Sequence, residues 1–173
     1  MPTGYIDPNG DIQVGWSPSP PPAHYTLINK AVRQPTAPST ATYISKTGVS
    51  PADYVADAFD MTTISTATTV SRIKIWWYGN QTGTGSNFYT NLIIGGVGIP
   101  GPTQNFSSSG YNSWSWEYTT FDGNWTQADL DSIRVDIWHA NSMSETIQVA
   151  AMYGEITYSY EVIGDSLGWA FGF

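Results

Sequence analysis

The chain of 173 residues contains no cysteine, and only six of its residues are lysine or arginine. The first absence excludes a disulfide framework and a thiolate metal site. The second makes a phosphate backbone or an anionic lipid surface an unfavourable partner, because both are bound through clusters of basic side chains and the net charge here is −8. We therefore expect no nucleic acid and no membrane among the partners.

Long apolar runs are also lacking, so no segment is predicted to cross a membrane as a helix. The first residues, Met1–Tyr5, have neither the basic region nor the apolar region of a secretory signal. If Met1 is the natural start, we expect the protein to be made and assembled in the cytoplasm of its host cell.

Side chains with catalytic chemistry are few and occur in no recognised arrangement. The two histidines, His24 and His139, are interpreted as surface or interface residues. Glu117 lies among tryptophans, but no second carboxylate is spaced along its strand as a glycosidase requires. No Gly-x-Ser-x-Gly elbow and no phosphate-binding loop occurs. We expect a protein that is not an enzyme, with no catalytic residue and no cofactor.

Asp7, Asn9 and Asp11 alternate along the chain like the first oxygen ligands of a calcium loop. Gly10 stands in the wrong place for that loop, and no glutamate follows at the position of the bidentate ligand. We interpret residues 7–11 as a tight turn built on Asn-Gly, and we expect no metal site.

Aromatic residues are abundant: eight Trp, eleven Tyr and six Phe make up 14% of the chain, and 17 Gly and 11 Pro punctuate it. This composition is typical of all-β proteins. Three segments alternate with a period of two, as half-buried strands do. Ile73, Ile75 and Trp77 oppose Arg72, Lys74, Trp76 and Tyr78; Trp114, Trp116 and Tyr118 oppose Ser113, Ser115, Glu117 and Thr119; Ile133, Val135 and Ile137 oppose Arg134, Asp136 and Trp138.

The last alternating segment, residues 147–162, changes parity, and Gly154 at the change predicts a β-bulge that bends one long strand. Helical turns are predicted at residues 25–32 and 124–131, with Thr126 as the N-cap of the second and Asp129 at its third position. Weaker strand candidates are residues 43–45, 54–59 and 88–94, and the other stretches, 34–50, 61–70, 79–86 and 95–102, are predicted mainly as loops.

Together these elements predict an all-β fold: an antiparallel β-sandwich, jelly-roll-like, with an N-terminal strand arm. We divide the chain into an arm with a proline-rich spacer (residues 1–23), a β-sandwich domain (24–163) and an aromatic C-terminal tail (164–173).

The predicted arm is a short strand carrying Ile12, Val14 and Trp16, which the proline run at residues 17–23 sets apart from the body. Unpaired backbone groups must find a sheet edge, either in the same subunit or in a neighbour. We predict these three side chains as interface residues.

The C-terminal tail carries Trp169, Phe171 and Phe173. Chain ends fray unless they are docked, so three aromatic side chains there predict a tail that packs into a groove of the same or another subunit.

A surplus of aromatic side chains lies opposite the aliphatic faces of the predicted strands, at Trp76, Tyr78 and Trp138. Three interpretations stay open. The protein itself covers these rings, they form a subunit interface, or they form a platform on which a glycan stacks.

Two stretches carry a resemblance. The first stretch is residues 8–18, followed by a short amphipathic turn and Tyr43–Ser45. The second is residues 125–138, where Trp-Thr-Gln-Ala-Asp-Leu precedes an alternating strand. Through these stretches the chain resembles uncharacterised jelly-roll structural proteins of tailed phages and of environmental bacteria. The resemblance implies a capsid decoration (cement) protein or a tail or fibre component, and no catalytic residues.

The function we expect is therefore that of a non-enzymatic virion protein that self-associates, with a trimer as the first expectation, and that docks on a major capsid or tail protein. Its mechanism would combine burial of aromatic surface with strand addition by the arm. The alternatives are an extracellular fibre protomer linked head to tail by strand exchange, and a glycan-binding module.

Overall fold

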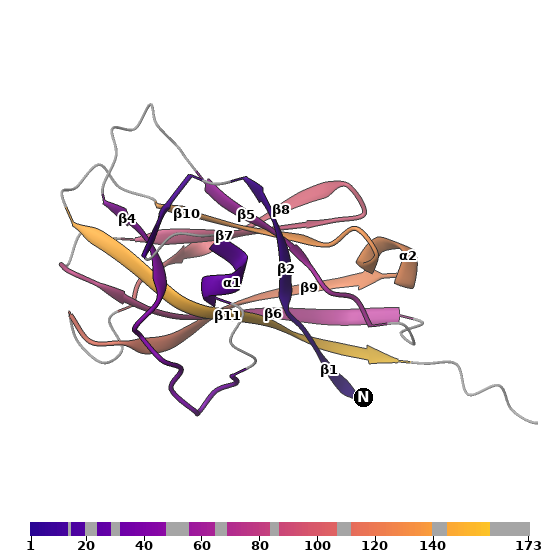
Figure 1. The fold of residues 1–173 in the computed structure, drawn as a ribbon. Helices are drawn as coiled ribbons and strands as arrows, with labels where there is room; N and C mark the ends of the chain where they lie inside the picture. The colour runs from indigo at the N-terminus through magenta and orange to yellow at the C-terminus, as the bar shows by residue number, and fades with distance from the viewer. Residues whose placement is uncertain are drawn as a thin grey trace, which may run out of the picture.

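The computed structural model describes residues 1–13, 15–19, 24–28, 32–47, 56–64, 69–83, 87–106, 112–139 and 145–159 (Figure 1). None of the helices in these ranges is long and apolar enough to span a membrane. The elements follow one another as β1 (Thr3–Ile6), β2 (Pro8–Gln13), β3 (Ser17–Ser19), α1 (His24–Ile28), β4 (Tyr43–Thr47), β5 (Ala56–Met61), β6 (Thr69–Gln81), β7 (Phe88–Ile94), β8 (Val97–Gln104), β9 (Ser115–Trp125), α2 (Gln127–Leu130), β10 (Arg134–His139) and β11 (Thr146–Ser159).

The strands form two antiparallel sheets that pack face to face, which confirms the predicted β-sandwich (Figure 1). Sheet A has the order β3-β4-β11-β6-β9, with β1 also paired to β11, and sheet B has the order β2-β5-β10-β7-β8. Strands β4 to β11 pair as along one long hairpin: β7 with β8, β6 with β9, β5 with β10 and β4 with β11. These pairs fall alternately in sheet B and sheet A, so the hairpin is rolled up, which is the topology of a jelly roll.

The core lies between the sheets and is built by the predicted alternation. Ile73, Ile75 and Trp77 on β6 are fully buried, and so are Val135 and Ile137 on β10. The buried Trp77 indole N–H donates to the Thr90 hydroxyl of the opposite sheet at 2.8 Å. This bond removes the cost of leaving an indole donor unpaired in the core.

The N-terminal segment pairs within its own chain and closes one edge of the sandwich. Strand β1 pairs β11 in sheet A, β2 crosses over to pair β5 in sheet B, and β3 returns to pair β4 in sheet A (Figure 1). The Asp57 carboxylate accepts the backbone N–H groups of Gly15 and Trp16 at 2.6 and 2.8 Å. The segment is therefore held by sheet pairing and by a buried acceptor of its own chain.

This placement corrects the predicted interface role of Trp16, while that of Ile12 stays a prediction. Trp16 is 3% exposed and belongs to the core of its own subunit, whereas Ile12 on β2 is 40% exposed. Val14 lies outside the described residues, and so do Trp169, Phe171 and Phe173 of the predicted tail.

The predicted bulge exists but lies elsewhere. The register of β11 against β6 shifts between Val149 and Ala151 and again between Thr157 and Tyr158, not at Gly154. Inward side chains change parity at the first shift, from Val149 to Met152. Gly154 has a different role, because a Cβ at this position would overlap the Ile6 side chain of β1. Glycine lets β1 approach the core.

Parts of two predicted loops, residues 79–81 and 97–102, are strands. Strand β6 continues through Gln81, which is buried, because Phe106 packs over Gly79 and its backbone N–H donates to the Gln81 side chain at 2.8 Å. Gly95 and Gly96 both have positive φ and form a two-residue hairpin turn, after which β8 begins. Its prolines are tolerated because β8 is an edge strand.

Both predicted helical turns are present in the structure. Thr126 caps α2 in a capping box with Asp129, as predicted. The other helical turn, α1, buries Leu27 and Ile28. The predicted turn at residues 7–11 is wrong, because β2 already begins at Pro8.

Replacing Trp16 with alanine should lower the free energy of unfolding by about 3–5 kcal/mol, because a large core side chain is lost. The matched change Ile12→Ala, at an exposed position in the same segment, should cost less than about 1 kcal/mol. Urea unfolding followed by circular dichroism measures both. If Trp16→Ala instead left stability intact and changed only the oligomer mass, the segment would pair between subunits.

Candidate functional site

The outer face of sheet A carries a continuous row of aromatic rings, which we call the belt. The alternation that buries Ile75 and Trp77 in the core places Trp76 and Tyr78 on this face. Each ring lies in contact with at least one other, with centroids between 4.6 Å (Trp76 to Tyr118) and 6.2 Å (Tyr43 to Trp114) apart, and Tyr5 joins the row through Tyr153. The belt consists of Tyr43, Trp114, Tyr78, Trp116, Tyr153, Tyr5, Trp76 and Tyr118.

Residues 32–36 cover the middle of the belt. The Trp116 indole N–H donates to the Thr36 carbonyl at 3.0 Å, and the Arg33 guanidinium lies over the Tyr153 ring at 4.6 Å from its centroid. Burial raises the pKa of Tyr153 to about 12, against a smaller opposing effect from the Gln34 backbone N–H. This part of the belt is therefore structural, as the first of the three predicted interpretations requires.

The belt is open at Tyr118, which is 47% exposed, beside the half-buried Trp76. Lys74 lies over both rings, at 5.2 Å from the Tyr118 centroid and 5.8 Å from that of Trp76. The Trp76 indole N–H is held by the Glu155 carboxylate at 3.1 Å. The open end thus presents fixed aromatic planes with a cation above them.

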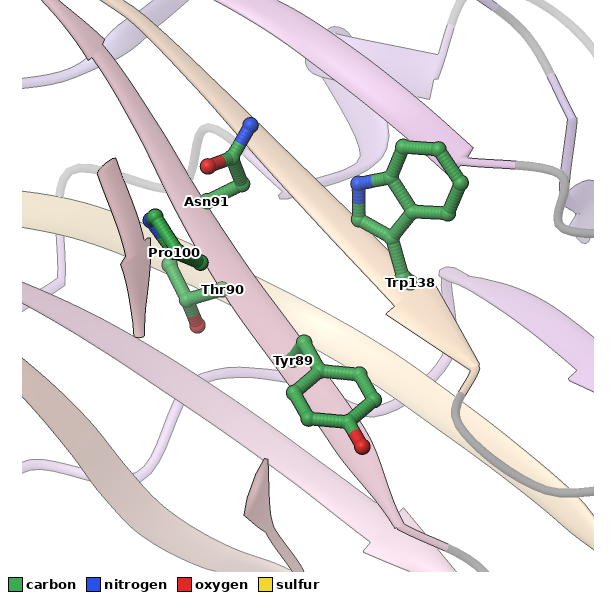
Figure 2. A pocket seen from close by; sticks show the side chains of 5 residues that line it. All are labelled: Tyr89, Thr90, Asn91, Pro100 and Trp138. Carbon is green, nitrogen blue, oxygen red and sulfur yellow. The ribbon is translucent and has the colours of Figure 1, made fainter. Parts of the chain in front are cut away.

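The outer face of sheet B carries a different site, a shallow hollow of about 260 Å³ lined by Tyr89, Thr90, Asn91, Pro100 and Trp138 (Figure 2). Sheet pairing assembles it, because Trp138 on β10 lies opposite Tyr89 on β7, and Asn91 on β7 lies opposite Pro100 on β8. Tyr89 is 37% exposed. The hollow combines two aromatic rings with one amide.

Asp136 lies beside this hollow and is only 7% exposed. The Asn91 side-chain amide donates to its Oδ2 at 3.3 Å, and the Trp138 side chain also hydrogen-bonds to this carboxylate. Oδ1 is buried and has no hydrogen-bond partner among the described residues. Burial raises the pKa of Asp136, against the lowering effects of Asn91, Trp138 and Arg134.

The structure separates residues that the sequence grouped together. Trp76 and Tyr78 lie in the belt, where Tyr78 is 8% exposed between Trp114 and Trp116, but Trp138 lies on the opposite sheet. The three therefore form no common platform. Tyr89, Asn91 and Asp136 were missed, although the alternation of Asp136 with Val135 and Ile137 already placed it on the face of Trp138.

The other predicted candidates have structural positions. His139 is 2% exposed at the end of β10, which corrects its interpretation as a surface residue, and His24 is the first residue of α1. Asp7 binds Arg33 at 2.6 Å, and Asp11 accepts the Tyr25 backbone N–H at 2.7 Å. Within the described ranges, no three histidine or acidic side chains gather as metal ligands would.

Replacing Asp136 with asparagine should stabilise the fold at neutral pH. Because the folded-state pKa of Asp136 is raised, its contribution to stability is full below the ordinary pKa of 3.8 and is lost as pH rises through the folded value. The variant should therefore unfold at a higher urea concentration than the wild type at pH 7, and the difference should shrink toward pH 4.

The control for this change is Asp122→Asn, at an exposed carboxylate on sheet A that is paired with Arg72. It should not stabilise the protein at pH 7, since the desolvation of an exposed charge costs little free energy. Equal stabilisation by both variants would attribute the effect to net charge and not to the burial of Asp136.

Comparison with known proteins gives fold similarity alone. No family model and no curated protein matches the sequence. Similar solved structures include a family 29 carbohydrate-binding module (8% identity over 90% of each chain, TM-score 0.49) and CBM29_1 from Piromyces equi (5% identity, 90% of this chain and 91% of that chain, TM-score 0.47). A structure of infectious bursal disease virus, Gt strain, matches 91% of this chain and 33% of its own (10% identity, TM-score 0.41). These values assign no function, which is therefore argued from the belt and the hollow.

Proposed function

We propose that this chain is a non-enzymatic structural subunit of a tailed-phage particle, of the capsid-decoration type, which self-associates through the open end of the belt. The observation that carries the proposal is the set of fixed rings at that end, where Tyr118 is 47% exposed and lies 4.6 Å from Trp76. Trp and Tyr with locked side chains bury large areas at a small entropic cost, and they dominate the energetics of interfaces.

The occupant we infer is a second copy of this chain. Two of the six basic residues, Arg33 and Lys74, lie over rings of the belt, and Arg72 lies on the same face of β6 as Lys74. Arg33 and Arg72 are bound by Asp7 and Asp122, while Lys74 contacts no carboxylate within the described residues. A chain with a net charge of −8 supplies such a carboxylate on its neighbour.

A contact between the belt of one copy and an acidic surface of the next is heterologous. Heterologous contacts close into rings when the rotation between copies allows it, and a trimer is the smallest such ring. This geometry supports the oligomer we expect from the sequence.

Strand exchange is not part of the proposal. Strands β1, β2 and β3 pair with β11, β5 and β4 of their own chain, so the N-terminal segment is already used within the subunit. We therefore prefer this proposal to the extracellular fibre alternative, whose protomers would be linked by that exchange. The placement in a virion rests on the sequence resemblance and on the use of jelly rolls in capsids, which is an analogy at the level of the fold.

The test is the mass of the purified protein, measured by light scattering over a concentration series. The wild type should be oligomeric, and Tyr118→Ala should raise the dissociation constant by about 30-fold, the loss of one hot-spot residue of roughly 2 kcal/mol. Lys74→Glu should also weaken the oligomer, and more so at low ionic strength.

The matched control is Tyr89→Ala, which removes a tyrosine of comparable exposure from the outer face of sheet B. It should leave the oligomer mass unchanged. A wild-type protein that stays monomeric at every concentration, or a Tyr118→Ala variant with unchanged mass, would refute self-association through the belt.

A further inference from the structure

We propose that the hollow on the outer face of sheet B binds one sugar ring of a neutral polysaccharide, stacked against Tyr89 and Trp138 and hydrogen-bonded by Asn91. This site is separate from the belt, and the proposal does not depend on self-association.

The lining of the hollow has the two chemical elements that a sugar ring needs. A pyranose presents C–H groups on its faces and hydroxyl groups around its edge. Tyr89 and Trp138 occur as a directly opposed pair on adjacent strands, so their rings border one patch (Figure 2). Asn91, on the same face of β7 as Tyr89, provides an amide that can both donate to and accept from hydroxyls.

Asp136 is the reason to regard the hollow as a built site. Its carboxylate receives the Asn91 amide N–H at 3.3 Å and a hydrogen bond from the Trp138 side chain, so one buried anion holds two of the lining residues. Bonds to an ionised acceptor are stronger than those between neutral groups. With one amide hydrogen directed at Asp136, the amide oxygen and the second hydrogen of Asn91 remain for a ligand.

This arrangement is not explained by stability. Asp136 is 7% exposed, and its Oδ1 has no hydrogen-bond partner in the described part of the chain, which is an unfavourable state for a carboxylate. A destabilising group that fixes the orientation of neighbouring side chains is typical of a preorganised binding site. We infer that Asp136 is a positioning residue for Trp138 and Asn91.

The size and charge of the hollow decide the class of ligand. None of its five lining residues is charged, so an anionic ligand would find no counter-charge there, and the carboxylate beside the hollow, Asp136, is only 7% exposed and accepts the Asn91 amide N–H. Its volume of about 260 Å³ is below the range of drug-sized pockets, roughly 300–1,000 Å³, so it suits a single ring. The site is open on a sheet face, which leaves room for the chain of a polysaccharide to continue on both sides.

The experiment is affinity electrophoresis of the full chain in gels containing xylan, mannan, galactan, dextran or β-glucan, followed by fluorescence titration with the polysaccharide that retards it. The wild type should be retarded by at least one of these probes. Tyr89→Ala, at a partly exposed position where folding is not at risk, should weaken binding by about tenfold. Trp138→Ala should do the same or more.

Asp136→Asn separates a positioning role from a merely structural one. We expect this variant to be more stable than the wild type at neutral pH and yet to bind the polysaccharide several-fold more weakly, because the anchor of the Asn91 amide and the Trp138 indole is weakened. A simple loss of structure would lower stability and binding together.

Tyr118→Ala serves as the control on the opposite face. Compared at protein concentrations where it and the wild type have the same oligomer mass, so that multivalency is equal, it should bind the polysaccharide like the wild type. Three results would overturn the proposal: no retardation of the wild type by any of the five polysaccharides, binding that survives both Tyr89→Ala and Trp138→Ala, or binding that is lost in Tyr118→Ala. The last result would move the sugar site to the belt.

Discussion

The long antiparallel pairing of β6 with β11 is the constraint on which the rest of the structure depends. Its register sets Ile73, Ile75 and Trp77 into the core and, by the same alternation, places Trp76 and Tyr78 outside. A slip by one residue would exchange the two faces. The core and the belt are thus two consequences of one register, which runs unbroken from Ala151 to Thr157 of β11 between two shifts, one at Val149/Ala151 and one at Thr157/Tyr158.

The pairing of β10 with β7 likewise determines which side chains of sheet B face the core and which face outward, but here the outward side chains contribute differently to stability. Val135 and Ile137 fill the core, while Asp136 and Trp138 face outward. On sheet A the outward aromatic side chains support one another and the fold gains from their contacts. On sheet B the buried Asp136 carboxylate lowers stability while it holds the Asn91 and Trp138 side chains in place. The outer face of sheet A therefore stabilises the subunit, whereas the outer face of sheet B is preorganised for a small ligand.

Alternation and local hydrogen bonding were sufficient to predict β6, β7 and β10 and the N-cap Thr126 with Asp129 at the third helix position, because these signals depend on neighbours in sequence. The errors share a non-local cause. Gln81 is buried because Phe106, far along the chain, packs over Gly79. Trp16 is in the core because Asp57 fixes the backbone before it. For the hollow, the alternation of side chains along β10 already placed Asp136 and Trp138 on one face of the strand. Only the pairing of β10 with β7, which the sequence does not reveal, brings Tyr89 and Asn91 beside them.

The two sites lie on opposite outer faces of one sandwich, with the core between them. Association through the belt therefore covers sheet A and leaves the hollow of sheet B turned away from that contact. Each copy in an assembly would then present one sugar site on its outside, in a repeating arrangement. A shallow site for a single ring binds weakly alone, but several such sites on one particle engage a polysaccharide with a gain that comes from effective concentration and needs no further contact. Self-association and sugar binding thus reinforce each other in a jelly roll that uses both of its faces.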